Sequence, residues 1–367
     1  MPADRFVTLA RKATLAMVIL GIDAHKRTHT VVAVDPLGRQ LGVKTTTSTT
    51  TDAHLDLVRW ADQFGPDRIW AVEDCRRLSR RLEADLLRHG ERIVRVPPKL
   101  MTHARDSARS YGKSDPIDAL AVARAALREP DLPTARLDGP ERELRQLVDH
   151  REDLLAERTR HINRLRWHLH EIDPSWDPPE RSLRQRTHLE AVAARLAGVD
   201  TLTGRIARDL VERISDLTRA EHALEAEITA RVTPLAPTLL AICGVGAVTA
   251  AKILGEVADV HRFRSKDAFA RHNGTAPIPV HSANRGRYRL SRIGNRQINA
   301  AIHRIAITQI RCHPDARAYR DRQVAAGKTK TEARRALKRR LSDVVYRALL
   351  ADAHLTAAEP TPTVIAA

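Results

Sequence analysis

The chain has few cysteines and no long apolar run, and each absence excludes a class of protein. Its three cysteines, Cys75, Cys243 and Cys312, stand far apart among 367 residues and form no Cys-x-x-Cys pair. This spacing argues against a disulfide scaffold and a zinc site, and it fits a reducing cytoplasm. No apolar stretch approaches the roughly 18 residues of a membrane span. We therefore expect a cytoplasmic protein with no membrane partner.

Acidic residues are scarce in one part of the chain. Between Arg262 and Arg347 there are 22 lysines and arginines but only 5 aspartates and glutamates, while the whole chain has a net charge of +17. The remainder is therefore balanced. A basic block inside a folded region indicates a polyanionic partner, usually nucleic acid. A merely solubilising surface is the alternative.

Residues 17–130 carry the hydrophobic pattern of an α/β domain. The predicted elements are strands at 18–23, 30–34 and 40–45, a helix at 52–64 capped by Asp52, a strand at 68–73, a helix at 79–89, a strand at 92–96 and a helix at 114–127 capped by Ser114. A meander of three strands followed by alternating helices and strands is the order of the ribonuclease H-like fold. Residues 1–16 are expected to be a disordered extension, and Met17 is an alternative start.

Residues 140–235 predict long helices with coiled-coil spacing, and the fold class is therefore α/β plus α. One seam repeats every seven residues, at Val148, Leu155, Ile162 and Leu169. A second seam alternates with it, at Leu144, Leu165 and Ile172, and two arginines, Arg151 and Arg158, interrupt this second seam. The pattern predicts a coiled-coil hairpin or a contact between subunits, with a plain bundle as the alternative. A mainly helical domain is expected at 236–350, and a disordered tail at 351–367.

Four acidic residues stand where the predicted elements would gather them. Asp23 ends the first strand, Glu73 ends the fourth, and Asp115 and Asp118 share one face of a helix. Strand ends of an α/β sheet are where such folds form their sites. Phosphoryl transfer uses this clustering, because Mg²⁺ or Mn²⁺ takes oxygen ligands and neutralises charge on the phosphate. Taken singly, each acid fits a turn or a helix start equally well.

Three strings carry a family resemblance: GIDAHK at 21–26, VE at 72–73 and KSDPIDA at 113–119. They resemble the motifs of the DEDD transposases, bacterial insertion-sequence enzymes with a RuvC-like domain that are related to the Piv-type DNA invertases. The resemblance implies a RuvC-like N-terminal domain in which the four acids bind the catalytic metal.

The C-terminal half begins with a glycine turn. Residues 239–250 have the form of a helix-hairpin-helix, with Gly244 and Gly246 in the turn that opens the second helix. Glycine permits positive φ and lets backbone N–H groups approach a DNA phosphate at a helix N-terminus. An ordinary connection between two helices is the alternative.

A second stretch resembles the second domain of the same family, through FARHNGTAP at 269–277, HSANRG at 281–286 and LSRIGNRQIN at 290–299. In that family a serine after the Pro-containing loop joins covalently to DNA, and Ser282 matches it. Nearby arginines would offset the phosphodiester charge as the hydroxyl attacks. Because Ala283 replaces the usual glycine, Ser291 is the alternative nucleophile. The predicted nucleic-acid-binding residues are Gly244, Gly246, Arg285, Arg287, Arg289, Arg292, Asn295 and Arg296.

A long helical insert separates Asp118 from Ser282. We therefore hypothesise a composite site, in which the carboxylates of one subunit serve the serine of another within a homodimer or tetramer. The family resemblance further implies a guide RNA, encoded by the element, that base-pairs with donor and target DNA. DNA as substrate implies association with the nucleoid.

Two other functions fit the same residues. A structure-selective nuclease, such as a RuvC-like junction resolvase, needs the four acids but no serine. A non-catalytic nucleic-acid-binding protein would use the acids only structurally. We favour a DNA transposase or recombinase that cleaves and exchanges strands by metal-dependent serine chemistry.

Overall fold

The computed structural model divides into two compact units, Met1–Asp138 and Gly139–Ala367, and each is described by itself. The described residues are 17–73, 78–97, 100–101, 114–129, 132, 134–136, 139–282, 285–289 and 294–358. None of the helices in these ranges is long and apolar enough to cross a membrane.

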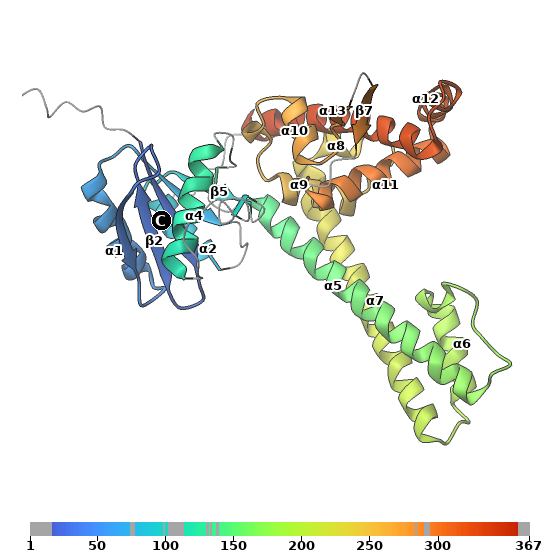
Figure 1. Ribbon diagram of the computed structural model, residues 1–367. Coiled ribbons are helices and arrows are strands. Elements are labelled where there is room, and N and C mark those ends of the chain that lie inside the picture. Colours follow the sequence, from blue (N-terminus) through green and yellow to red (C-terminus); the bar gives the residue numbers. More distant parts are fainter. Residues whose placement is uncertain are drawn as a thin grey trace, which may run out of the picture. The chain divides into compact units, whose positions relative to one another are not determined.

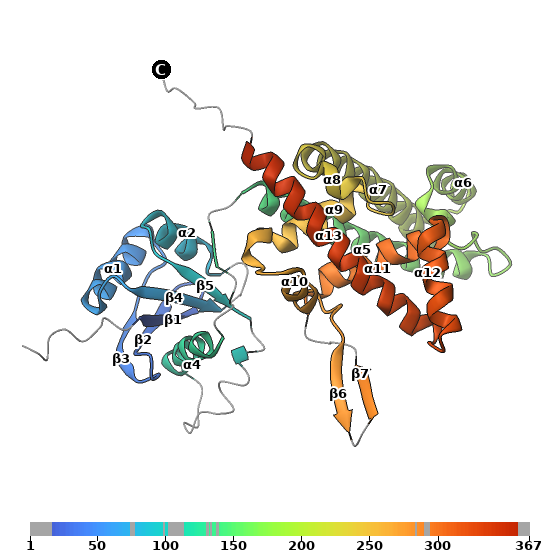
Figure 2. The same cartoon turned by 90° about the horizontal axis from the view of Figure 1, so that it is seen from above.

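The first unit is built on a mixed sheet with strand order β3-β2-β1-β4-β5 (Figure 2). The strands are β1 (Val18–Ala24), β2 (His29–Val34), β3 (Gln40–Thr45), β4 (Arg68–Glu73) and β5 (Ile93–Val96). The first three form an antiparallel meander, whereas β4 is parallel to β1 and β5 is parallel to β4. This topology confirms the predicted α/β class and the ribonuclease H-like order.

Helices cover both faces of this sheet (Figure 2). On one face, α1 (Thr51–Ala61) and α2 (Arg80–Arg88) enclose a core that includes Leu57 and Trp70. On the other face, α4 (Asp115–Arg128) covers a core that includes Val32. Alternate residues of each strand supply the two cores because strand side chains alternate between the faces of the sheet.

Two predicted helix caps differ from the structure. Thr50, not Asp52, caps α1, because its hydroxyl accepts a hydrogen bond from the backbone N–H of Ala53. The predicted helix over 52–64 ends earlier, at Ala61, and a 3₁₀ turn at Asp62–Phe64 follows it. Ser114 stands at the N-cap position of α4, but its side chain makes no capping bond.

The second unit begins with a long antiparallel helical hairpin. It consists of α5 (Pro140–Ile172) and α7 (Leu202–Leu235), with α6 (Arg186–Leu196) packed at its far end (Figure 1). An apolar core at that end includes Leu165 of α5 and Leu210 of α7. Of the predicted alternatives, the structure shows the helical hairpin within the chain, since α5 packs against α7.

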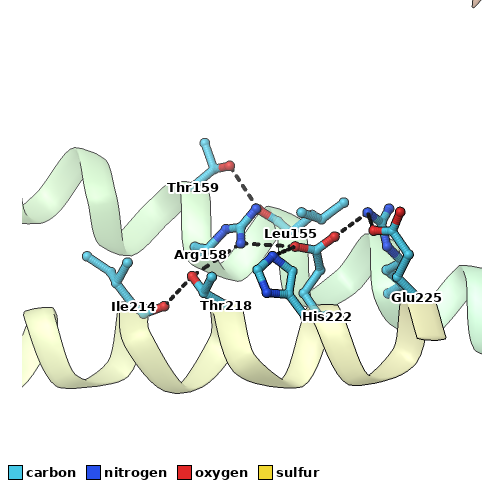
Figure 3. Close-up of polar contacts among 9 residues, drawn as sticks. Leu155, Arg158, Thr159, Ile214, Thr218, His222 and Glu225 are labelled. Carbon is cyan, nitrogen blue, oxygen red and sulfur yellow. Dashed lines mark hydrogen bonds and ion pairs between the residues drawn. The ribbon is translucent and has the colours of Figure 1, made fainter. Parts of the chain in front are cut away.

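A layer of charged side chains joins the middle of α5 to α7, as Figure 3 shows for Arg158. Arg158 is 7% exposed and donates to the Thr218 hydroxyl and to the Glu221 carboxylate, each at 3.2 Å. Arg151 donates to the same carboxylate and to Glu225. The two arginines that interrupt the seam in the sequence therefore pair across it. Any slip of α5 along α7 would leave these charges buried and unpaired, so the layer fixes the register.

The remaining elements form a helical body with one β-hairpin. They are α8 (Pro237–Leu240), α9 (Ala247–Val257), α10 (Lys266–His272), β6 (Ile278–Ser282), β7 (Arg285–Arg289), α11 (Arg296–Cys312), α12 (Pro314–Ala325) and α13 (Lys330–Ala358). Their core includes Phe269 and Ile302, and it also takes in Leu144 of α5 and Val232 of α7. The base of the long hairpin and the C-terminal helices therefore share one core, on both sides of the predicted boundary at residue 235.

The predicted disordered tail is wrong for residues 351–358, because α13 continues to Ala358. Asp352 holds this end of the helix in place. Its side chain is nearly fully buried and accepts the backbone N–H groups of Thr238 and Leu239 at the start of α8. A buried carboxylate with two such donors is well satisfied.

The fold also brings together two cysteines that are distant in sequence. The sulfurs of Cys243 and Cys312 lie 3.6 Å apart, and both thiols are free and exposed. This contact is a weak thiol hydrogen bond rather than a disulfide.

The charged layer of the hairpin predicts an asymmetric response to mutation. Glu221→Ala would leave two largely buried arginines short of their shared carboxylate and should cost about 3–5 kcal/mol of stability. Glu225→Ala removes a half-exposed partner of Arg151 and should cost less than about 1 kcal/mol. Chemical denaturation, monitored by the circular dichroism signal of the helices, measures the free energy of unfolding of both variants. Equal effects of the two variants would contradict the structural role given to Glu221.

Candidate functional site

The first candidate site lies at the carboxyl ends of β1 and β4. These strands pair in parallel up to Ile22 and Val72, so Asp23 and Glu73 are the next residues on adjacent strands. Asp23 is 7% exposed and Glu73 is partly exposed. The sheet therefore brings two of the four predicted acids to one edge.

A glycine lets α4 bring the other two acids to the same edge. A Cβ atom on Gly21 would lie 2.2 Å from the Ala119 carbonyl oxygen and 2.5 Å from the Ala123 nitrogen. Only a residue without a side chain permits this contact between helix and strand. The first turn of α4, with Asp115 and Asp118, therefore stands beside the end of β1.

Three side chains meet closely enough to share one metal ion. Ligand atoms of Asp23, His25 and Asp115 all lie within 4.8 Å of one another, and they form the only such group found among the described residues. The His25 Nε2 atom is 3.0 Å from Asp23 Oδ2 and 3.4 Å from Asp115 Oδ1. His25 is not among the site residues predicted from the sequence, although it belongs to the first family motif. No spacing rule singles it out, because it lies just past the strand.

Electrostatics in this cluster favour a bound cation. Burial raises the pKa of Asp23, the neighbouring His25 opposes that shift, and the charges of Asp118 and Asp115 raise the pKa further. A desolvated carboxylate crowded by other acids is stabilised in its charged form by a nearby divalent cation. Carboxylate oxygens with one ring nitrogen form a donor set that suits such an ion.

The second candidate site is the β-hairpin that carries Ser282, which Figure 2 shows extending from the helices. Its backbone register pairs Ser282 with Arg285, Val280 with Arg287 and Ile278 with Arg289. The segment around Ser282 is therefore a pair of strands, and three predicted nucleic-acid-binding arginines occupy the strand opposite Ser282. The predicted residues Ser291 and Arg292, with Ala283, lie outside the described residues.

The side chains of two asparagines, Asn273 and Asn299, hold the base of this hairpin. Asn273 is fully buried, and its Oδ1 accepts from the backbone N–H and the hydroxyl of Thr275, at 3.0 and 2.6 Å. Asn299 of α11 donates from Nδ2 to the Asn273 carbonyl at 2.8 Å. A Cβ on Gly294 would lie 2.3 Å from the Gly274 nitrogen. The backbones of the segments before and after the hairpin thus pack directly against each other at Gly274 and Gly294.

The predicted helix-hairpin-helix has a first helix of only four residues, α8. Gly244 adopts φ +86° in the turn, and a Cβ there would meet Thr308 of α11 at 3.1 Å. Gly246 is the N-cap of α9, and nothing lies within 4 Å of a Cβ placed on it. The N-terminus of α9 is thus sterically accessible, as contact with a phosphate requires.

Two further predicted residues open α11. Asn295 is its N-cap: its Oδ1 accepts from the backbone N–H groups of Gln297 and Ile298, and its Nδ2 donates to Glu256 at 2.6 Å. The structure thus gives Asn295 a capping role. Arg296, the first helical residue, is exposed.

Comparisons with known proteins cover both units. Residues 20–174 match a DEDD-type IS110 transposase family model, and residues 236–321 match the model of the IS116/IS110/IS902 transposase family. The chain is 30% identical to an uncharacterized 44.8 kDa protein of insertion element IS116 from Streptomyces clavuligerus, covering 94% of this chain and 97% of that protein. It is 28% identical to the uncharacterized 43.6 kDa protein of IS110 from Streptomyces coelicolor, covering 90% and 94%.

Other comparisons are more distant. An uncharacterized 42 kDa protein of insertion element IS900 from Mycobacterium paratuberculosis is 26% identical, with 90% of this chain and 94% of that protein covered. Among solved structures, T. thermophilus RuvC in complex with a Holliday junction substrate is 16% identical, with a TM-score of 0.27, and the match covers 32% of this chain and 99% of that one.

The contact between Gly21 and α4 can be tested by adding one methyl group. Gly21→Ala should destabilise the first unit by about 1–3 kcal/mol, because the helix must move away from the strand. It should also weaken Mn²⁺ binding, since the acids of α4 move with the helix. Thermal unfolding and titration calorimetry measure the two effects. Gly198→Ala is the control, since a Cβ there meets no atom within 4 Å; no difference between the variants would contradict the close packing.

Proposed function

Because the chain belongs to the IS116/IS110/IS902 family of transposases, we propose that it cleaves and rejoins DNA strands by metal-dependent phosphoryl transfer with Ser282 as the nucleophile. A transposase acts on DNA, so DNA is its substrate. The observation that most supports the chemistry is the meeting of Asp23, Asp115 and His25 at the end of β1. These residues lie in the part of the chain that the first family model matches.

The four acids are proposed to hold the metal, with Mg²⁺ or Mn²⁺ as the ion. Bound there, the ion would neutralise developing charge on the phosphate. The chain's own contribution is to bring the carboxylates together before the metal binds. His25 contacts Asp23 and Asp115 at once and so orients both oxygens. Asp118, 7% exposed, adds negative charge beside Asp23.

Ser282 is proposed to attack the scissile phosphorus. Its Oγ would form a P–O bond to one DNA end while the other end leaves with a free hydroxyl. Attack by the hydroxyl of another strand would then release the serine and complete the exchange. The arginines at 285, 287 and 289 occupy the paired strand of the same hairpin, where positive charge stabilises the phosphorane-like transition state.

DNA and RNA contacts are proposed for the second unit. The open N-terminus of α9 at Gly246 fits a backbone phosphate, and Arg296 adds an exposed positive charge at the start of α11. A guide RNA that selects donor and target sites belongs to the same proposal. The metal cluster lies in the first unit and Ser282 in the second. We propose that subunits of an oligomer combine these two half-sites.

Loss of either half-site should abolish strand exchange. Asp115→Asn and Ser282→Ala should each lower DNA cleavage by about a thousandfold or more, as expected when groups that act as a unit are removed. The assay adds Mg²⁺ and RNA transcribed from the flanks of the gene, and denaturing gels detect protein–DNA adducts. Only the wild type should form an adduct that depends on metal.

Matched variants separate this function from its rivals. Ser291→Ala and Asp200→Asn, an exposed loop acid, should leave the adduct intact. Metal-dependent cutting that survives Ser282→Ala, with no adduct, would instead identify a nuclease. Normal DNA binding with no cleavage under any condition would favour a non-catalytic protein.

A composite site predicts complementation between inactive proteins. A mixture of Asp115→Asn and Ser282→Ala subunits should recover activity, because some pairs contain one intact acid cluster and one intact serine at the same site. For random dimers with two composite sites, about a quarter of all sites would be intact. Cleavage by the mixture, compared with each variant alone, measures this. A mixture as inactive as its components, despite proven exchange of subunits, would rule the composite site out.

A further inference from the structure

A buried lysine that pairs with none of the described acids lies between α11 and α13. Lys338 is only 9% exposed, and its Nζ donates to the Asn299 Oδ1 at 2.6 Å. Within the described ranges of the chain, no carboxylate forms an ion pair with it. A buried ammonium group whose one partner is a neutral amide is costly unless an anion compensates its charge.

The charged neighbours of Lys338 are themselves positive. Burial, together with the charges of Arg334, Arg296 and Arg335, lowers the pKa of Lys338 to about 8. None of these three arginines forms an ion pair with an acid that the structure describes. Four positively charged side chains therefore lie near one another, and they repel each other.

Helical spacing explains how these cations meet. Arg296, Asn299 and His303 recur on one side of α11, and Arg334 and Lys338 are four residues apart on α13, the helix that packs against it. Burial lowers the pKa of His303, and the charges of Lys338 and Arg334 lower it further, so the two rows face each other.

The acids closest in sequence to this cluster already have other hydrogen-bond or ion-pair partners. Two described carboxylates of α13, Glu332 and Asp343, flank the cluster in sequence. Glu332 accepts hydrogen bonds from the backbone N–H and hydroxyl of Thr329. The hydrogen bonds from Thr329 are the main cause that lowers the pKa of Glu332, and the charge of Arg335 contributes less. On the other side, Arg339 is paired with Asp343 and Asp267. The cluster therefore keeps its excess positive charge.

Hydrogen bonds connect the cluster to the base of the β6–β7 hairpin, which carries Ser282. Asn299 accepts from Lys338 through Oδ1 and donates through Nδ2 to the Asn273 carbonyl. Asn273 in turn holds Thr275, three residues before β6. An anion bound at Lys338 would thus lie one side chain away from the segment that positions the hairpin.

We propose that Lys338, Arg334, Arg335 and Arg296 form a binding site for one backbone phosphodiester group of the nucleic acid, beside the base of the β6–β7 hairpin. The identity of the ligand rests on the proposed function, whereas the need for an anion rests on the charges. Guanidinium groups recognise phosphate oxygens through paired hydrogen bonds, and the lysine adds a point charge. Both DNA and RNA supply this phosphodiester.

Binding measured without catalysis tests the site. Full-length protein in EDTA is titrated into a labelled 30-base-pair DNA duplex and, separately, a labelled RNA, over a series of salt concentrations. Lys338→Met and the double variant Arg334→Gln/Arg335→Gln should weaken binding about tenfold and lower the salt slope by about one for each phosphate that the variant no longer neutralises. Weakening with DNA only, or with RNA only, identifies which polymer supplies the phosphate.

Arg339→Gln is the matched control, because it removes the same charge from the neighbouring residue, whose guanidinium is already paired. It should bind almost as wild type, and Lys338→Arg should retain binding. Unchanged binding and slope in Lys338→Met and in the double variant would overturn the proposal, as would equal weakening by Arg339→Gln. The double variant decides the matter should Lys338→Met fail to fold, as judged by its thermal unfolding. Since neither metal nor Ser282 takes part, an inactive enzyme whose variants show this weakening would refute the proposed chemistry and leave the site standing.

Discussion

The first unit depends on the contact between Gly21 and α4. The sheet alone would place Asp23 and Glu73 at one edge, but Asp115 and Asp118 belong to a helix that arrives more than 90 residues later. They join that edge because β1 carries no side chain where α4 crosses it, and the helix backbone approaches within van der Waals contact. The resulting crowding of carboxylates around a desolvated Asp23 is unfavourable by itself. It becomes favourable when a cation binds, which is how a fold can hold a metal site ready.

The second unit depends on buried polar groups in the same way. In the helical hairpin, Glu221 satisfies two arginines and so fixes how α5 and α7 align. In the C-terminal body, hydrogen bonds of Asn273 and Asn299 connect the base of the β6–β7 hairpin to α11 and α13. Apolar packing would tolerate small shifts in either place, whereas a buried charge or amide loses its partner when the helices move. Groups that must act on one phosphate need such fixed positions.

The two units have complementary chemistry. The first gathers negative oxygens for a cation, and the second carries the basic block with Ser282 at the end of a strand whose neighbour bears arginines. A junction resolvase would need only the first of these. The match of both units to transposase family models, over most of the chain's length, accounts for both together. The basic block is also not uniform, since Arg339 is neutralised by acids while Lys338, one residue earlier, is surrounded by cations.

The sequence by itself determined the order of the α/β elements, the long helices and the positions of the four acids at element ends, because alternation, heptad spacing and short motifs are local signals. Only the structure selected the hairpin within the chain from its alternatives. The sequence placed Asp52 as a cap and ended α13 too early, since the competing groups, Thr50 and the distant N–H groups that Asp352 receives, are visible only in three dimensions. It also took Arg151 and Arg158 for interruptions and overlooked His25. Tertiary structure alone decided these, because the partner of a polar group can lie at any distance along the chain. Burial then sets how much a polar pair contributes to stability, and burial is a property of the packed fold.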